Sequence, residues 1–322
     1  MLDIYDVEPN WDLFEDDCVN RKWGNPSCMK CSNLYFCHEH PDDRLDKETG
    51  HWYNIYPFSQ RESTIKEGVE YVPFEITRHN RHLIGYGENY KTKNKKYYDS
   101  CAEWEQIIPD TFEYNGVNYL IKAIGDDGFY HCDELRVVST PHSVESIAFH
   151  SFNDCFDLEA IYIGKGTKII NARFIECFNL IKIKVHEDNP YFCDVNGVLF
   201  SKDMKILIRY PAGRKEEEYE IPEGVEEVAS YAFYGCPFLK RIKGSKTLKK
   251  IGESCFRCSK KLEYVLLNIC LEKIETNVVL GCDKLQEVYY QGSKAQWESI
   301  EKDNKFDEIV LDKKVKIFCL GG

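Results

Sequence analysis

The sequence lacks the segments that would carry the chain into or across a membrane. No run of apolar residues approaches the roughly 18 that a transmembrane helix needs, so we expect no membrane insertion. The opening residues, MLDIYDVEPNWDLFEDD, contain no basic segment followed by an apolar stretch, so no secretory signal is visible. We therefore expect a cytoplasmic protein, with a cell-surface or secreted location as the alternative if this sequence has lost its signal.

The sequence also lacks the motifs that organise common catalytic sites. It has no GxSxG, no phosphate-binding GxxxxGK[ST], no HExxH and no GxGxxG that opens a helix. His131, His142, His150 and His186 are scattered at predicted turns, and no nucleophile is paired with a base. This absence predicts that the protein is not an enzyme.

An excess of positive charge is missing as well. The formal net charge is −12 and the isoelectric point is near 5.3. Because nucleic-acid binding draws most of its affinity from cations placed on phosphates, this balance argues against a nucleic-acid partner. A negative net charge does not exclude a local patch of basic residues.

The second half of the chain repeats a short phrase: Phe, two residues, Cys, two residues, Leu, two residues, then Ile or Val. From copy to copy the cysteine advances by 23, 22, 59, 22 and 24 residues, a period typical of a solenoid with one repeat per coil. The six copies are Phe129–Cys132–Leu135–Val138, Phe152–Cys155–Leu158–Ile161, Phe174–Cys177–Leu180–Ile183, Phe233–Cys236–Leu239–Ile242, Cys255–Cys258–Leu262–Val265 and Val279–Cys282–Leu285–Val288.

Each coil is predicted to contain a short strand that follows the repeat leucine. In residues 158–163, alternation directs Ile161 and Ile163 inward and Ala160 and Tyr162 outward. Parallel strands of successive coils would lie about 4.8 Å apart, and the repeated side chains would form a single continuous interior. The repeat cysteines are small residues that tolerate burial, and Cys255 is assigned to the Phe position of its coil.

The 59-residue step contains an insert at about 188–220. Asn196-Gly197 between apolar residues predicts a tight hairpin, and residues 201–205 predict a second turn. Pro211 and Gly213 would end the strand that follows. The insert is therefore interpreted as extra strands that continue the sheet, with another coil starting near Ile221.

From about residue 105 to residue 319, the sequence resembles the BspA-type leucine-rich repeat family. The similarity is carried by IGDDGFYHCDELRVV, NPYFCDVNGVLFSKDMKILIRYPAG, IPEGVEEVASYAFYGCPFLKRI and VYYQGSKAQWESI. The resemblance implies a right-handed solenoid of short parallel strands and a bacterial protein that binds other proteins. It also implies surface adhesion as an alternative function. We divide the chain into a cysteine-rich N-terminal capping region, 1–104, and the solenoid, 105–322.

If the strands are placed correctly, two outward positions per coil form rows along the array. The first row is Val137, Ala160, Lys182, Arg241, Tyr264 and Glu287, and the second is Ser139, Tyr162, Lys184, Lys243, Leu266 and Tyr289. The candidate partner-binding residues are Lys182, Lys184, Arg241, Lys243, Tyr162, Tyr264 and Tyr289. A basic cluster flanked by tyrosines favours an unknown, acidic protein partner, and a solvated face is the alternative.

The N-terminal region has one constellation with metal-ligand character. Cys18, Cys28, Cys31 and Cys37 lie within twenty residues, next to His38 and His40, and thiolates suit zinc or an iron–sulfur cluster. Free thiols or a disulfide pair are the alternatives. Residues 25–41 also resemble a SPASM-type cysteine segment, although the CxxxCxxC motif of radical-SAM enzymes is absent, so no such activity is inferred.

Two classes of function follow. The first is a non-enzymatic protein-interaction module that uses the exposed strand face of the array. The second is an accessory protein that binds metal through the N-terminal cysteines. Because no secretory signal is visible, we expect most of the 15 cysteines to be reduced.

Overall fold

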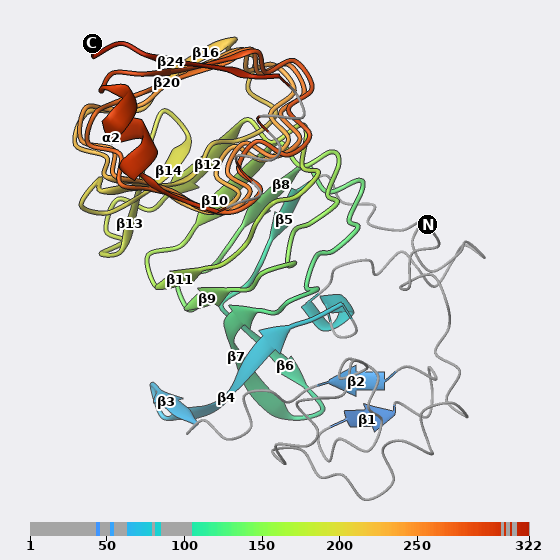
Figure 1. The fold of residues 1–322 in the computed structure, drawn as a ribbon. Coiled ribbons are helices and arrows are strands. Elements are labelled where there is room, and N and C mark those ends of the chain that lie inside the picture. Colours follow the sequence, from blue (N-terminus) through green and yellow to red (C-terminus); the bar gives the residue numbers. More distant parts are fainter. Residues whose placement is uncertain are drawn as a thin grey trace, which may run out of the picture.

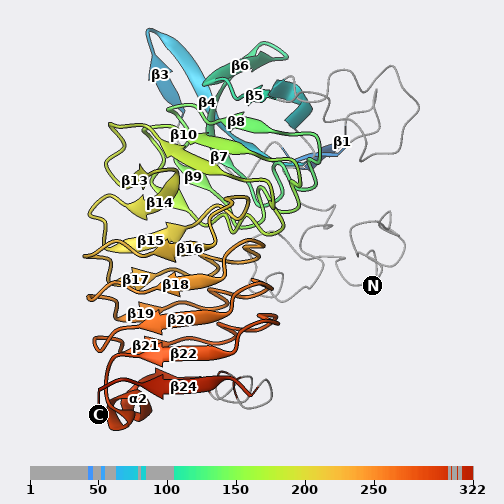
Figure 2. The same cartoon turned by 90° about the horizontal axis from the view of Figure 1, so that it is seen from above.

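The protein folds as a repeat solenoid, as predicted (Figure 1). The computed structural model describes residues 43–45, 52–54, 63–78, 81–84, 105–303, 306, 310 and 314–321. Most coils contribute one strand to each of two opposite sides, which we call the front sheets and the back sheets. Figure 2 shows the later coils as successive rungs, and each of these coils carries one strand of the series β17, β19 and β21 and one of the series β18, β20 and β22.

The front sheets contain the strands that follow each repeat leucine. The first holds β5 (Glu105–Ile107), β8 (Val137–Ser139), β10 (Ala160–Ile163) and β12 (Lys182–Val185). The second holds β16 (Glu218–Glu220), β18 (Arg241–Lys243), β20 (Tyr264–Leu267), β22 (Glu287–Tyr290) and β24 (Lys316–Cys319). Neighbouring strands pair in parallel in both sheets, which confirms the predicted stacking.

The back sheets combine two-residue strands of the repeats with longer strands that precede the first repeat or belong to the insert. The first holds β3 (Thr64–Lys66), β4 (Val69–Ile76), β6 (Thr111–Tyr114), β7 (Val117–Ile124), β9 (Ser146–Ile147) and β11 (Ile169–Ile170). The second holds β13 (Phe192–Val195), β14 (Val198–Ser201), β15 (Ile206–Arg209), β17 (Glu227–Val228), β19 (Lys250–Ile251), β21 (Lys273–Ile274) and β23 (Glu301–Lys302).

The described part of the chain also holds a strand pair, β1 (Asp43–Leu45) with β2 (Trp52–Asn54), a 3₁₀ helix, η3 (Arg81–Ile84), and an α-helix, α2 (Lys294–Ser299). Ser293 caps α2 in a capping box with Gln296, and the buried Trp297 packs against Tyr290 at a ring distance of 5.4 Å. Among the described residues, no helix has both the length and the apolar character needed to cross a bilayer.

Strand β4 joins the array from the N-terminal side of the boundary that we predicted at residue 104. It pairs in parallel with β7, and its Phe74 and Ile76 are fully buried in the same core as Phe129. These side chains cover the interior that the first repeat would otherwise expose.

The repeat phrase forms a turn that carries a column of rings. The ring of Phe152 stacks on Phe129 at 5.3 Å and on Phe174 at 5.8 Å, with interplanar angles of 1° and 9°. The thiols of the same turns act as donors: Cys155 Sγ donates to the Phe129 carbonyl at 2.9 Å, and Cys177 Sγ donates to the Phe152 carbonyl at 2.9 Å. The repeat cysteine is therefore a small hydrogen-bond donor that satisfies a buried carbonyl of the preceding coil.

The fifth copy of the phrase was assigned wrongly from the sequence. Phe256 fills the aromatic position, since its ring lies 5.6 Å from Phe233, and Cys282 Sγ donates to its carbonyl at 3.0 Å. Ser259 fills the thiol position, since its hydroxyl donates to the Phe233 carbonyl at 2.7 Å. The sequence alignment of the copies relied on cysteine, so it placed the first two positions of this copy one residue too early. Serine can stand at the thiol position because its hydroxyl donates the same hydrogen bond.

The insert adopts the predicted hairpin. Strands β13 and β14 pair antiparallel across Asn196-Gly197, β14 pairs antiparallel with β15, and β15 pairs in parallel with β17. Both faces of β14 are buried: Leu199 belongs to the N-terminal core, whereas Val198 and Phe200 belong to the C-terminal core. The expectation of one continuous interior is therefore wrong, because a strand with a period of two divides the interior into two cores.

Two arginines connect the halves on either side of this strand. The guanidinium carbon of Arg173 lies 3.4 Å from the ring centroid of Phe149 and 3.8 Å from that of Tyr231, which comes from the C-terminal half. Arg209 is 2% exposed and donates to the Phe174 carbonyl on one side and to the Tyr231 carbonyl on the other.

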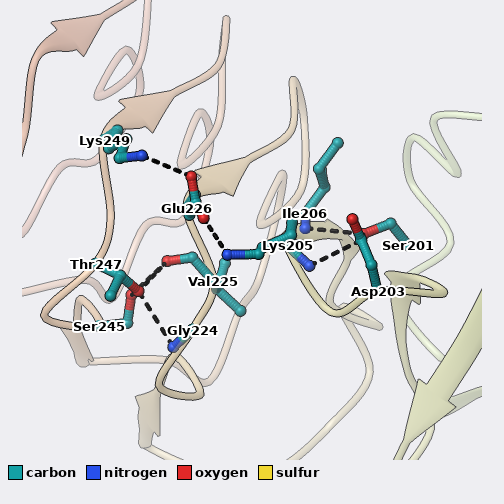
Figure 3. Close-up of polar contacts among 10 residues, drawn as sticks. All are labelled: Ser201, Asp203, Lys205, Ile206, Gly224, Val225, Glu226, Ser245, Thr247 and Lys249. Atoms are coloured by element: carbon teal, nitrogen blue, oxygen red, sulfur yellow. Dashed lines mark hydrogen bonds and ion pairs between the residues drawn. The ribbon is translucent and has the colours of Figure 1, made fainter.

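Ion pairs on the back of the array join one coil to the next. Figure 3 shows Glu226 between Lys205 and Lys249, which lie on the preceding and following coils; the Lys249 Nζ to Glu226 Oε2 distance is 2.7 Å. Hydrogen bonds from Lys205 and Lys249 lower the pKa of Glu226 to about 2. The same alternation recurs at Glu145, which Lys122 and Lys168 contact at 2.8 and 3.2 Å.

This arrangement predicts acid sensitivity. A carboxylate whose pKa is lowered on folding stabilises the fold above its unfolded pKa and loses that contribution as the pH falls through its folded pKa. We expect the melting temperature of the wild type to exceed that of Glu226→Gln between about pH 5 and 7. The difference should disappear as the pH approaches about 2, the folded pKa of Glu226. Differential scanning calorimetry across this range would measure it, and a pH-independent difference would contradict it.

Candidate binding surface

The outward rows predicted from the sequence are present on the front sheets. Val137, Ala160 and Lys182 are register partners across β8, β10 and β12, and the second row continues in the same way through Tyr162 and Lys184. One side chain departs from the prediction: Ala160 is only 3% exposed, because its short methyl group lies between the longer side chains of its two row neighbours.

The four candidate cations do not form one cluster. Lys182 and Lys184 lie on β12 of the first front sheet, whereas Arg241 and Lys243 lie on β18 of the second. Strand β16 precedes β18 and is its pairing partner, and it is not paired with β12. The structure therefore brings these residues together only as two separate pairs.

Each cation already has a partner within the chain. Lys184 Nζ lies 2.7 Å from Asp194 Oδ2, and Lys182 Nζ lies 5.1 Å from the ring centroid of Tyr162. On the second sheet, Arg241 pairs with Glu218 and Lys243 pairs with Glu220, the latter at 2.5 Å. The carboxylate partners come from the hairpin and from β16, whereas Tyr162 comes from β10. The neighbouring carboxylates leave little net positive charge on the face.

The aromatic candidates form a more continuous surface. Tyr264 contacts Tyr289 edge-on at 5.8 Å, and Tyr289 stacks on Phe318 at 5.0 Å. The Tyr289 hydroxyl donates to Glu287 at 2.6 Å, and this bond raises the pKa of Tyr289. Sequence reasoning missed Phe318, although extending the Leu266–Tyr289 row by one coil into β24 leads to it.

A hollow of about 560 Å³ opens at the junction between the two front sheets. It is lined by Ile181, Arg214, Lys215 and Glu216, which precede β12 and β16. Arg214 Nη2 lies 2.6 Å from Glu216 Oε1, and Arg214 also donates to the Asn196 carbonyl. Arg214 is thus engaged within the chain, and the exposed Lys215 and the half-exposed Ile181 remain in the lining.

The proposed metal ligands Cys18, Cys28, Cys31 and Cys37 lie outside the described residues. Within the part of the chain that the structure describes, no group of three or more histidine, cysteine or acidic side chains is arranged to hold a metal ion. The ten described cysteines are free thiols, and most of them are buried.

Burial makes the repeat thiols inert. It raises the pKa of Cys177 and of Cys236 to about 12 in each case, so neither forms a thiolate near neutral pH. Cys270 is exposed. We expect iodoacetamide at about pH 8 to alkylate Cys270 and to leave Cys177 and Cys236 unmodified until denaturant is added. Peptide mass spectrometry would show this, and equal labelling of the three thiols in the folded chain would contradict it.

Comparison with known families agrees with the architecture. The sequence profile of the BspA type leucine-rich repeat region matches residues 92–196 and 213–318, in six copies. The chain belongs to the BspA-type leucine-rich repeat family. The residues between the two matched segments include strands β14 and β15, so the profile is interrupted within the insert.

The chain is also similar to solved structures of bacterial leucine-rich repeat proteins. A leucine-rich repeat protein from Eubacterium ventriosum is 20% identical, with 84% of each chain covered and a TM-score of 0.44. The pneumococcal vaccine antigen PcpA is 15% identical, with 82% of this chain and 96% of that chain covered and a TM-score of 0.37. A leucine-rich cell surface protein from Faecalibacterium prausnitzii is 19% identical, with 63% and 91% covered and a TM-score of 0.32. No curated protein matches the chain.

Proposed function

We propose that this BspA-type protein is a non-enzymatic protein-binding module whose binding surface is the front of the array. The observation that carries the proposal is the continuous register of outward side chains along two parallel sheets. Regular rows on a rigid scaffold place contact residues at fixed spacing, which reduces the entropy lost on binding.

Within the front sheets, the aromatic residues are the anchors of this proposal. Tyr162 is 38% exposed, and Tyr264, Tyr289 and Phe318 form a contact chain on the second sheet. Tyrosine supplies a large contact area at a low cost in side-chain entropy, and it is enriched in interfaces. Lys182, Lys184, Arg241 and Lys243 would add specificity by exchanging their internal partners for acidic groups of a partner protein.

A photo-crosslinking residue at position 162 tests the surface, with the same residue at position 169 as the matched control. Tyr162 lies on β10 of the front, and Ile169 lies on β11 of the back and is 52% exposed. In an extract of cells that produce the protein, position 162 should yield a discrete adduct and position 169 should not. Adducts from position 169 alone would contradict the proposal.

The role of the four cations can be tested in the same assay. Reversing Lys182, Lys184, Arg241 and Lys243 to glutamate should weaken adduct formation at position 162 if the partner is acidic. Unchanged capture would remove the cations from the binding surface and leave the aromatic residues as its basis.

Two further roles from the sequence remain proposals. The family resemblance supports surface adhesion, and cell fractionation with protease treatment of intact cells would separate a surface location from a cytoplasmic one. The spacing of Cys28 and Cys31 supports metal binding. About one zinc per purified chain, lost in Cys28→Ser, would support that role, and an absence of metal would leave the binding module alone.

A further inference from the structure

The turns of the N-terminal half form a second surface, separate from the front sheets. It lies beside the repeat cysteines, at the position before each Cys and at the two positions after it. In three consecutive coils these positions place carboxylates around two phenylalanines. We call this surface the acidic ridge: Asp133, Glu134, Asp154, Phe156, Asp157, Glu176 and Phe178.

The carboxylates of the acidic ridge differ from other carboxylates of the array in their ion pairs. On the sheets, acidic side chains such as Glu145, Glu226 and Glu218 pair with a lysine or arginine one coil away. Among the described residues, no lysine or arginine forms an ion pair with a ridge carboxylate.

The ion pair that the structure gives to the acidic ridge comes from a histidine. His131 Nε2 lies 3.4 Å from Asp154 Oδ2. The pKa of Asp133 and that of Glu176 are both raised, by burial first and then by repulsion from neighbours that include Asp154. These groups therefore carry negative charge that a cation from outside the chain would stabilise.

The two phenylalanines add an apolar element to the acidic ridge. Phe156 is 37% exposed and Phe178 is 40% exposed, and each directly follows its repeat cysteine. The core does not need them, because the column of Phe129, Phe152 and Phe174 fills the aromatic position inside the same coils. Exposed rings at equivalent positions of adjacent coils form a small apolar surface bordered by acidic groups.

We propose that the acidic ridge binds a cationic segment of a partner protein, rich in lysine or arginine and carrying an apolar side chain that covers Phe156 and Phe178. Charge complementarity selects this occupant, because the ridge carboxylates and the net charge of −12 both attract a basic segment. The basic turns of a second copy, with Lys260, Lys261 and Lys284, are the competing occupant, and the overall negative charge of both copies opposes it. The proposal concerns a different surface from the front sheets and stands independently of them.

Selection from a random dodecapeptide phage library on the immobilised full chain tests the proposal. We expect the enriched peptides to contain an excess of lysine and arginine together with at least one large apolar residue. The most enriched peptide is then synthesised with a fluorescent label, and its affinity for the full chain is measured by fluorescence anisotropy at low and at raised salt. Affinity should fall as salt screens the charges.

Two variants with the same change in net charge locate the site. The ridge variant is Asp133→Asn/Asp157→Asn/Glu176→Gln, and the control is Glu187→Gln/Glu263→Gln/Glu272→Gln, three exposed carboxylates elsewhere on the array. The ridge variant should weaken peptide binding about tenfold or more, whereas the control should change it about twofold or less. Phe156→Ser/Phe178→Ser should weaken it about fivefold or more, with circular dichroism confirming that the fold is kept.

Three results would overturn the proposal. The first is an enriched set without basic residues, and the second is an equal loss of affinity in the ridge variant and the control. The third is self-association of the wild type in sedimentation equilibrium that the ridge variant abolishes, which would assign the ridge to a second copy of the chain. The crosslinking result at position 162 reports on the front sheets and would be unaffected by any of these.

Discussion

Arg209→Ala is expected to lower the free energy of unfolding by about 3 to 5 kcal/mol. The Arg209 side chain is buried between the two cores, and its guanidinium donates to the carbonyls of Phe174 (3.0 Å), Tyr231 and Tyr234 (3.4 Å). Burial lowers the pKa of Arg209, since the charge has left water. Alanine would remove the guanidinium bonds to these carbonyls and would create a cavity. The Tyr231 carbonyl would keep only its bond from the Tyr234 N–H, and the Phe174 carbonyl only a long one from the Cys177 N–H.

The repeat pattern explains why an arginine stands at this position. In the preceding coils, the carbonyls of Phe129 and Phe152 accept a hydrogen bond from the thiol of the next turn. The coil after that of Phe174 belongs to the insert, whose cysteine, Cys193, donates to the Ser201 carbonyl. Arg209 Nη2 donates to the Phe174 carbonyl instead. The long side chain bonds to Phe174 of the N-terminal half and to Tyr231 of the C-terminal half, so one residue replaces the missing donor and joins the two halves.

Urea denaturation followed by circular dichroism would measure the effect of Arg209→Ala. The matched control is Arg136→Ala, because Arg136 is 40% exposed at its side chain and pairs with Glu159 on the surface. That change should cost less than about 1 kcal/mol. Because Arg209 connects the two cores, we also expect the variant to unfold less cooperatively. Equal losses in the two variants would contradict the proposed role of Arg209.

Phe152→Ala is the second large effect that we expect, a loss of about 3 to 5 kcal/mol. The ring of Phe152 is fully buried and stacks on Phe129 and on Phe174. Its removal takes contacts from both neighbouring coils at once, and the flanking rings cannot close the gap without moving their own coils.

Phe156→Ala is the matched control for this prediction, because Phe156 lies in the same turn but is 37% exposed. It should cost about 1 kcal/mol or less. Chemical denaturation of the two variants under the same conditions compares them directly. If Phe152→Ala were as mild as Phe156→Ala, the ring column would not support the N-terminal core.

Much of the fold could be predicted because the same residue types occupy the same structural positions in successive coils. Phe, Cys and Leu at fixed spacing identify the turn, and alternation after the leucine identifies the inward and outward side chains of strands such as β10. The Asn196-Gly197 hairpin was also predictable, because few dipeptides suit so tight a turn. The error at Cys255 arose where Phe256 and Ser259 preserve the geometry with a different donor.

The candidate surface was less predictable, because it depends on residues that meet only after folding. Lys184 forms an ion pair with Asp194 of the hairpin, and Arg241 forms one with Glu218 of β16. The order of residues in β13 and in β16 does not indicate either ion pair. Spacing within the repeat placed Lys182 and Lys184 on one strand correctly. It could not show that Arg241 belongs to a separate sheet.

Local spacing alone was sufficient to establish a coiled, strand-built array with buried rings and thiols, because every coil solves the same packing problem with its immediate neighbours. The division into two cores at β14 and the neutralisation of the front cations could be seen only in three dimensions. Both depend on where the hairpin comes to lie against strands distant from it in the chain, and contacts of that kind leave no periodic trace in the order of the residues.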